Sequence, residues 1–370
     1  MEGCKVFSVN NIQTPEYHIA LRPDCHIDFA EQLNTITQKY EEITKELDLT
    51  NENLIFAKIF ISDYVNLNKY LVGNDIIQRI FQSCAVSIIE QPPLDGTNIN
   101  LFLYFIKSDH IEKERNSDAI FTTINGLTHI YQSVTKFDSS AMNAEEQTRS
   151  AFVKHMNLLS EHNLKLKDNC VRTWLYSRDV DRDYAAIVKA RNAIFDEEGL
   201  TRDTHYIAST GIEGKGLLSH SSVNIDFYSI DGIGEEQIQY LQALDYLNNT
   251  SEYGVTFERG TSIKYTDKKH IFISGTASID KYGNCVHRNN VLKQTERLFT
   301  NIEMLLNDAQ SELKDIAQMI VYLRNSADYA CINKYLEDRF GSVPKAIVLG
   351  RVCRPEWLIE VECIAVNTDQ

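Results

Sequence analysis

The chain has 370 residues, of which 43% are hydrophobic and 24% are charged, so it is long enough to hold two or three cores. It carries 37 Lys and Arg against 52 Asp and Glu, a net charge of −15 that would repel a polyanion, so we expect no nucleic-acid partner. The apolar run 101–106 is far shorter than the roughly 20 residues that cross a bilayer. With no signal-peptide pattern at the start, we expect no membrane partner and a cytoplasmic location.

The eight cysteines are spread along the chain, and none forms a C-x-x-C pair. This distribution is typical of reduced thiols in a cytosolic protein rather than of a disulfide framework. The ten histidines show no H-E-x-x-H spacing. We therefore expect no metal site.

One unit is repeated three times along the chain. A sequence that begins with Asp-Tyr recurs as DYVNLNKYL at Asp63, DYAAIVKAR at Asp183 and DYACINKYL at Asp328. Matching helices open at Gln147 and Gln294, which are 147 residues apart, and a weaker copy opens at Gln32. Self-similarity at this scale indicates tandem structural units.

Each unit is predicted to have a long amphipathic helix, a strand, the Asp-Tyr helix and a closing strand. In chain order the predicted strand pairs are 56–62 and 98–106, 170–176 and 223–230, and 317–323 and 358–366. A hairpin over 262–280 precedes the third unit's first helix. The pattern favours an α+β fold, with units at 1–110, 111–235 and 236–370. Three joined units can close like a trimer, so we expect a monomer with internal pseudo-threefold symmetry and three clefts.

The repeats can be compared with one another at the closing strands. Aligned from their last apolar residues, these strands carry Asn100, Asn224 and Glu360 at the same position. A carboxyl group on a partly buried strand has a raised pKa and can donate or accept a proton. Alternatively, Glu360 pairs with a nearby arginine as a structural ion pair. On spacing alone the two interpretations are equal.

Two arginines stand where the other units are apolar. Arg191 aligns with Leu71 and Leu336 on an apolar helix face, and Arg172 aligns with Ile59 and Met319. A guanidinium in such a place indicates an anion site, because it binds carboxylates in a two-pronged fashion. The alternative for Arg191 is a salt bridge at the rim with a buried stem.

Three further features are weaker candidates. Residues 209–214 are predicted to form a turn that offers backbone N–H groups to an anion, or that only turns the chain. We expect Arg259 either to contact a ligand or to anchor the linker before the third unit. Cys353 is interpreted as a small apolar filler and not as a nucleophile.

The third unit resembles the RidA (YjgF) family over 253–366. The motifs that carry the resemblance are Phe272 to Gly275, the Gln294 helix with Asn301, 317–323 and 358–362. The resemblance implies a trimeric arrangement with ligand clefts between units, and it implies that Glu360 is the residue that activates water. The substrate-binding arginine of its imine deaminases falls on Ala346 here, which disfavours ordinary 2-imino-acid deamination. The family's endoribonuclease label fits a chain of charge −15 poorly.

A second resemblance, over about the last two hundred residues, is to the chorismatases, which are single chains of RidA-like units. It rests on Arg172 to Trp174 with Tyr176, Arg191, 209–212, Phe257 with Arg259, 274–279, and Cys353 with Arg354 before Glu360.

This second resemblance implies that a small anionic metabolite, chorismate, is cleaved to pyruvate and a hydroxybenzoate without any cofactor. Glu360 would protonate the enol ether, and the two carboxylates would bind Arg172, Arg191 and Arg259. Tyr176 would donate a hydrogen bond to the substrate. The pair Gly275 and Cys353 would shape the pocket for release of a hydroxybenzoate. The alternatives are a Rid-type deaminase or hydrolase acting on another small carboxylate, and a non-catalytic metabolite-binding protein.

Overall fold

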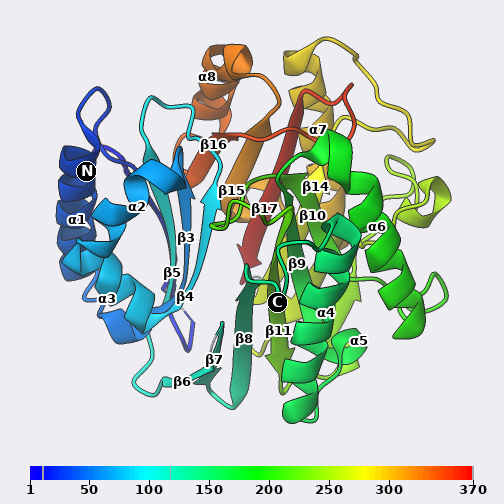
Figure 1. Cartoon of the computed structure of the whole chain (residues 1–370), viewed down its shortest axis with the longest axis horizontal. Coiled ribbons are helices and arrows are strands. Elements are labelled where there is room, and N and C mark those ends of the chain that lie inside the picture. Colours follow the sequence, from blue (N-terminus) through cyan, green and yellow to red (C-terminus); the bar gives the residue numbers. More distant parts are fainter. Residues whose placement is uncertain (11, 117, 369–370) are drawn as a thin grey trace.

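The computed structural model describes residues 1–10, 12–116 and 118–368, and it arranges the strands in three sheets with helices on their outer faces (Figure 1). The central strands are arranged in the same way in all three sheets. A middle strand runs antiparallel to the closing strand on one side and parallel to a short edge strand on the other. This parallel pair is joined through the Asp-Tyr helix, as a parallel connection requires.

The first sheet has the strand order β1-β2-β5-β3-β4. Its strands are β1 (Cys4–Val9), β2 (Glu16–Leu21), β3 (Leu54–Ile61), β4 (Ala85–Glu90) and β5 (Ile99–Ile106). The helices α1 (Phe29–Glu46), α2 (Tyr64–Val72) and α3 (Asp75–Ser83) cover its outer face (Figure 1). Helix α1 buries Leu33, Ile36, Tyr40 and Ile43, which is the spacing of three and four that one helix face requires.

The second sheet has the strand order β10-β9-β11-β8-β7-β6. Its strands are β6 (Glu112–Asn116), β7 (Ala119–Ile124), β8 (Leu127–Val134), β9 (Cys170–Ser177), β10 (Ala208–Glu213) and β11 (Val223–Asp231). Its helices are α4 (Ala144–Glu161), α5 (Leu166–Asn169) and α6 (Val180–Glu197). The turn predicted over 209–214 is wrong, because this segment is the edge strand β10, paired in parallel with β9.

The third sheet has the strand order β12-β13-β14-β17-β15-β16. Its strands are β12 (Ile238–Tyr240), β13 (Gly260–Lys264), β14 (Lys269–Thr276), β15 (Ile316–Leu323), β16 (Lys345–Leu349) and β17 (Ile359–Asn367). The helices α7 (Val291–Asp308) and α8 (Tyr329–Phe340) lie on its outer face. The hairpin predicted before α7 is present as β13 and β14.

The strand registers test the comparison between repeats. Asn100, Asn224 and Glu360 each lie opposite the seventh residue of their middle strand, so their alignment is correct.

The alignment of Arg172 is wrong. The register places Arg172 at the position of Phe56 and Gln318, not of Ile59 and Met319. The offset of 147 residues between the first helices is not kept in the strands, where Arg172 and Gln318 are 146 residues apart.

The Asp-Tyr helices also differ in where they begin. Asp63 caps α2 by accepting a hydrogen bond from the backbone N–H of Asn66. In the second unit the capping residue is Asp179, so α6 begins about one turn before Asp183. Arg191 is therefore displaced by one turn from the position of Leu71, counted from the cap.

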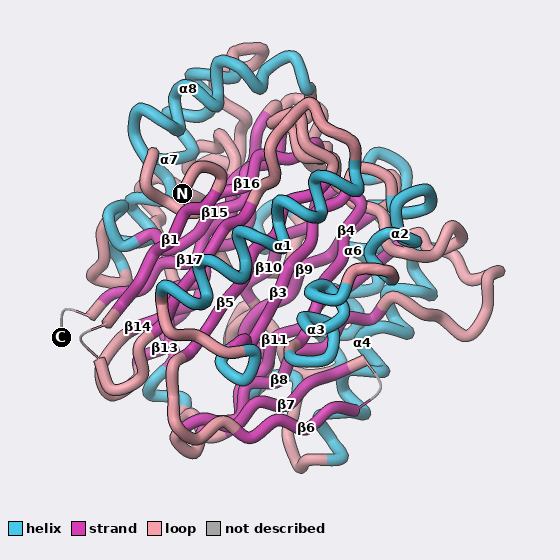
Figure 2. Tube along the Cα trace, turned by 90° about the vertical axis from the view of Figure 1, so that its left-hand side faces the viewer, coloured by secondary structure: helices cyan, strands magenta, loops and turns pink. Residues whose placement is uncertain are grey.

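The three units close on one another at the ends of their edge strands. Isolated antiparallel bridges join Glu90 to Lys215, Pro93 to Val348 and Ile212 to Val352, one at each contact between units. The strands gather in the middle and the helices lie outside them (Figure 2). This is the predicted α+β fold of three units forming an internal pseudo-trimer.

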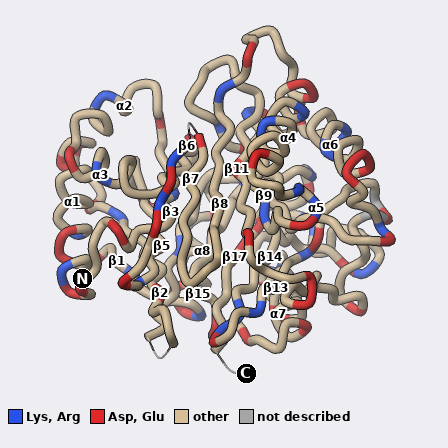
Figure 3. Tube along the Cα trace, turned by 90° about the horizontal axis from the view of Figure 1, so that it is seen from below, with Lys and Arg blue, Asp and Glu red and all other residues tan. Residues whose placement is uncertain are grey.

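Charged residues of both signs are interspersed around the outer helices and loops (Figure 3). Within the described residues, no helix combines the length and the apolar character needed to span a membrane.

Candidate functional site

Glu360 lies on the closing strand β17 where the second and third units meet, and it is 5% exposed. Its carboxyl group has no hydrogen bond or ion pair with any described residue. Burial raises its pKa to about 8, and the negative charge of Glu362 adds to the shift, while Arg172 and Arg259 oppose it. The side chain is therefore mostly neutral at pH 7 and holds a proton that it can donate.

Gly275 lets the Glu360 carboxyl group approach the backbone of β14. A Cβ at this position would lie 2.8 Å from the carboxyl carbon of Glu360 and 3.1 Å from Cγ2 of Thr210. The backbone N–H of Gly275 donates to Oγ1 of Thr210 across the contact between units, at 3.0 Å. The glycine is required here by space rather than by backbone conformation.

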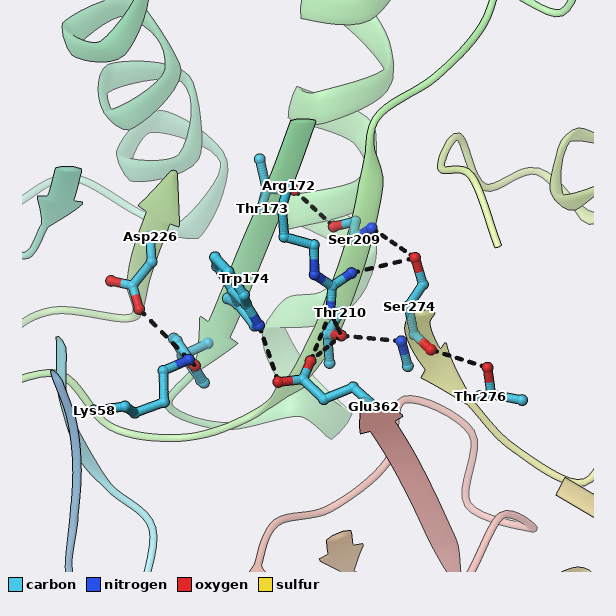
Figure 4. A network of polar contacts seen from close by, with 12 residues as sticks. Lys58, Arg172, Thr173, Trp174, Ser209, Thr210, Asp226, Ser274, Thr276 and Glu362 are labelled. Carbon is cyan, nitrogen blue, oxygen red and sulfur yellow. Dashed lines mark hydrogen bonds and ion pairs between the residues drawn. The ribbon is translucent and has the colours of Figure 1, made fainter. Parts of the chain in front are cut away.

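Glu362, two residues further along β17, is held by donors from the second unit (Figure 4). It accepts hydrogen bonds from Nη2 of Arg172 at 2.7 Å, from Nε1 of Trp174 at 2.9 Å and from Oγ1 of Thr210. Arg172 also donates to Ser274 at 3.2 Å and to Thr210 at 2.5 Å. The structural ion pair considered for Glu360 is thus formed by Glu362, and the guanidinium of Arg172 is engaged by protein groups.

A second buried network, which the sequence comparison missed, lies beside the first. Lys58 of β3 donates to the hydroxyl of Tyr176 at 2.5 Å and lies 4.0 Å from Asp226 of β11. The hydroxyls of Ser87 and Ser133 donate to Asp226 at 2.5 and 2.6 Å. The sequence does contain a sign of this network, namely a lysine and an aspartate inside otherwise apolar strands. Each buried charge needs a partner, so the two residues could have been predicted to pair.

Arg191 and Arg259 both lie near the ring of Phe257. Their guanidinium carbons are 6.0 and 5.4 Å from the ring centroid. Arg191 is 1% exposed, so it is not a rim residue. Arg259 donates to the carbonyl and side-chain oxygens of Asn248, and its charge lowers the pKa of Glu360. Arg259 is therefore close enough to Glu360 for its charge to act on that carboxyl group, and Phe257 lies near both arginines.

Cys353 is adjacent to Glu360 and Tyr184. Burial and the negative charge of Glu360 raise the pKa of its thiol to about 12. A thiol with this pKa stays protonated at neutral pH, in agreement with the interpretation that it is not a nucleophile. The ring of Tyr184 lies against Gly211, where a Cβ would come within 2.8 Å.

The residue that faces Glu360 across the contact between units comes from the edge strand of the second unit. Thr210 pairs with Trp174 as Ala346 pairs with Ile320, so Thr210 and Ala346 occupy equivalent edge-strand positions. Ala346 belongs to the strand that meets the first unit, so Thr210 is the edge-strand residue that faces Glu360. Neither Thr210 nor Ala346 is the substrate-binding arginine that the imine deaminases of the resembled family carry.

Among the described residues, no group of three His, Cys, Asp or Glu side chains is arranged to hold a metal ion.

Comparisons with known proteins assign the family. The Endoribonuclease L-PSP family matches residues 262–367. A RutC family protein of Pyrococcus abyssi is 33% identical over 97 residues, which are 26% of this chain and 76% of that protein. The chain belongs to the RidA superfamily. A 3-aminoacrylate deaminase RutC of Acinetobacter baylyi is 30% identical over 98 residues, 26% of this chain and 77% of the relative. This RidA-superfamily similarity accounts for about the last quarter of the chain.

The whole chain also has a counterpart among solved structures. A crystal structure of a chorismatase superposes with a TM-score of 0.67 and covers 94% of this chain and 98% of its own, at 15% identity. This similarity shows that the entire fold, including the first unit, is shared. The predicted family and fold are confirmed, and the roles of the individual site residues stay predictions.

Proposed function

We propose that this protein is a chorismatase-like enzyme that converts chorismate to pyruvate and a hydroxybenzoate, with Glu360 as general acid. The observation that carries the proposal is the buried carboxyl group of Glu360 with its raised pKa, placed within the influence of Arg172 and Arg259 at the contact between units. The superposition on a chorismatase supports the substrate class through the fold.

The chemistry needs a proton donor with a raised pKa. The electron pair of the enol-ether double bond takes the proton of Glu360 at the methylene carbon and leaves an ionised carboxylate. The bond between the ether oxygen and the ring then breaks and pyruvate departs. The ring cation loses one proton to become aromatic, which restores the acid. The atoms of chorismate equal those of the two products, so no co-reactant or cofactor is consumed.

The two carboxylates of chorismate require cationic partners. In this proposal Arg191 and Arg259 bind them, held in orientation by the ring of Phe257. Arg172 acts as a positioning residue, because its guanidinium already binds Glu362. Gly275 and Cys353 shape the space beside Glu360. Tyr176, whose hydroxyl accepts a hydrogen bond from Lys58, is the proposed hydroxyl donor on the second unit.

The test is incubation of the purified chain with chorismate, with pyruvate and aromatic products followed by chromatography. We expect equimolar pyruvate and hydroxybenzoate, a loss of at least about 100-fold in Glu360→Gln, and unchanged turnover in Glu296→Gln, an exposed carboxylate of α7. Failure to consume chorismate would refute the proposal. Ammonia release from 2-aminoacrylate would instead identify a Rid-type deaminase.

A further inference from the structure

The contact between the third and first units contains a small basic pocket of about 100 Å³. Its wall includes Lys5 and Arg22 of the first unit, Asn100 of β5, and Tyr329, Asn333 and Lys345 of the third unit. It lies away from Glu360, which is at the contact between the second and third units. The volume exceeds the roughly 10–15 Å³ that one water needs, so several heavy atoms fit inside.

The closing strand at this contact between units carries less negative charge than the closing strands at the other two contacts. The register places Asn100 where Glu360 stands and Phe102 where Glu362 stands. The contact between the first and second units keeps Asp226 at the second of these positions. The closing strand that faces this pocket is β5. Among the described residues, it is the one closing strand without a carboxylate at the positions of Glu360 and Glu362.

The two carboxylates that do line the pocket are occupied. Asp95 accepts hydrogen bonds from Thr97 and from Nδ2 of Asn100. Glu337 lies 2.9 Å from Nζ of Lys345, a side chain that is only 6% exposed. Lys345 balances the charge of Glu337, whereas the donors around Asp95 are neutral groups that orient this carboxylate without balancing a charge.

The remaining basic groups have no counterion in the described part of the chain. Neither Lys5 nor Arg22 forms an ion pair or side-chain hydrogen bond there, although the chain has a net charge of −15. Burial lowers the pKa of Lys345, and the charges of Lys5 and Arg22 lower it further, against the opposing effect of Glu337. Because Glu337 balances Lys345, two cations, Lys5 and Arg22, stand against the one carboxylate of Asp95, and they give the pocket a local positive potential.

We propose that this pocket binds the phosphate or carboxylate group of a small metabolite without transforming it. Lys5 and Arg22 neutralise the anion, and Lys345, held by Glu337, forms part of the pocket wall. Tyr329 and Asn333 supply neutral hydrogen-bond donors. An amide stands at the position of the proton-donating carboxyl group, so a bound ligand meets no general acid.

The test is calorimetric titration of the full chain with inorganic phosphate and, separately, with succinate at low ionic strength. We expect saturable binding at one site, with the tighter of the two probes identifying the anionic group. The double variant Lys5→Gln with Arg22→Gln should bind at least about tenfold more weakly. The control Lys69→Gln with Lys293→Gln removes the same charge from exposed sites on other elements and should bind normally.

Two outcomes would overturn the proposal. One is the absence of saturable binding for both probes. The other is equal affinity in the two double variants, which would assign the binding to Arg191 and Arg259 or to the overall charge of the chain.

Discussion

At the scale of single residues, the pair Glu360 and Glu362 shows how partners decide the state of a carboxyl group. Both lie on one face of β17 and both are 5% exposed. Glu362 accepts three hydrogen bonds, one of them from an arginine, all from the second unit. Glu360 accepts none from the described residues, so burial favours its neutral form. The same strand thus holds one carboxyl group fixed by donors of the second unit and one that burial favours as an acid.

The raised pKa of Glu360 makes stability depend on pH. The unfolded chain releases this proton near pH 4.5 and the folded chain near pH 8, so its contribution to stability is complete below pH 4.5 and falls as the pH rises to 8. We predict that the free energy of unfolding decreases more between pH 5 and pH 8 in the wild type than in Glu360→Gln. The difference should be at most about 1.4 kcal/mol per pH unit in urea unfolding. Equal slopes, with Glu296→Gln as control, would contradict a protonated Glu360.

Gly275 provides a second residue-level prediction. Gly275→Ala would press a methyl group against the Glu360 carboxyl group and displace it from the cleft. We expect turnover of chorismate to fall at least about tenfold, because small misplacements of catalytic groups are costly. Thermal unfolding should change by only a few degrees. Gly73→Ala, where a Cβ has room at 3.4 Å from its nearest neighbour, is the matched control. Full activity in Gly275→Ala would exclude this role for Gly275.

At the scale of elements, strands of neighbouring units are joined by buried ion pairs. Arg172 of β9 pairs with Glu362 of β17, and Lys58 of β3 approaches Asp226 of β11. In each pair the cation comes from a middle strand and the carboxylate from the next unit's closing strand. A buried ion pair contributes more to the specificity of assembly than to stability. Removing one partner strongly destabilises the fold, because the other charge is left buried without a partner.

Lys58 tests this arrangement. Lys58→Met leaves Asp226 buried without its nearest cation and should lower the free energy of unfolding by about 3–5 kcal/mol. The double variant Lys58→Met with Asp226→Leu should recover most of this loss, because both charges are then removed. Urea unfolding of the single and double variants measures the coupling. Additive losses would show that the two residues do not interact.

The elements also show what could be predicted from the sequence. The repeats located the middle and closing strands and aligned Glu360 with its counterparts, because alternation and self-similarity persist there. The edge strand β10 was missed, since Ser209, Thr210 and Gly211 have the composition of a turn and become a strand only through pairing with β9. The position of Arg172 was misassigned because the offset between helices does not hold in the strands. Its pairing with Glu362 depends on contact between units, which no spacing within one unit reveals.

At the scale of the whole molecule, joining three units allows the three clefts to differ. The contact of the second and third units has two carboxylates on its closing strand, that of the first and second units has one, and that of the third and first units has none. Three separate identical chains could not make this distinction. The joined chain therefore permits one catalytic cleft and two clefts with other roles.

Closure within one chain also predicts the oligomeric state. The bridges at all three contacts lie inside the chain, so the edge strands β4, β10 and β16 are already covered. We predict a monomer of 42.4 kDa in sedimentation velocity experiments at micromolar concentration. A stable trimer would show that the contacts are exchanged between chains.

The proposed role of Glu360 as proton donor is tested most directly by measuring its protonation state. Infrared difference spectra between wild type and Glu360→Gln, recorded across pH, isolate the carbonyl band of this one protonated carboxyl group. We predict that the band is present at pH 7 and disappears with a midpoint near pH 8. A Glu360 already ionised at pH 6 would contradict its role as the proton donor.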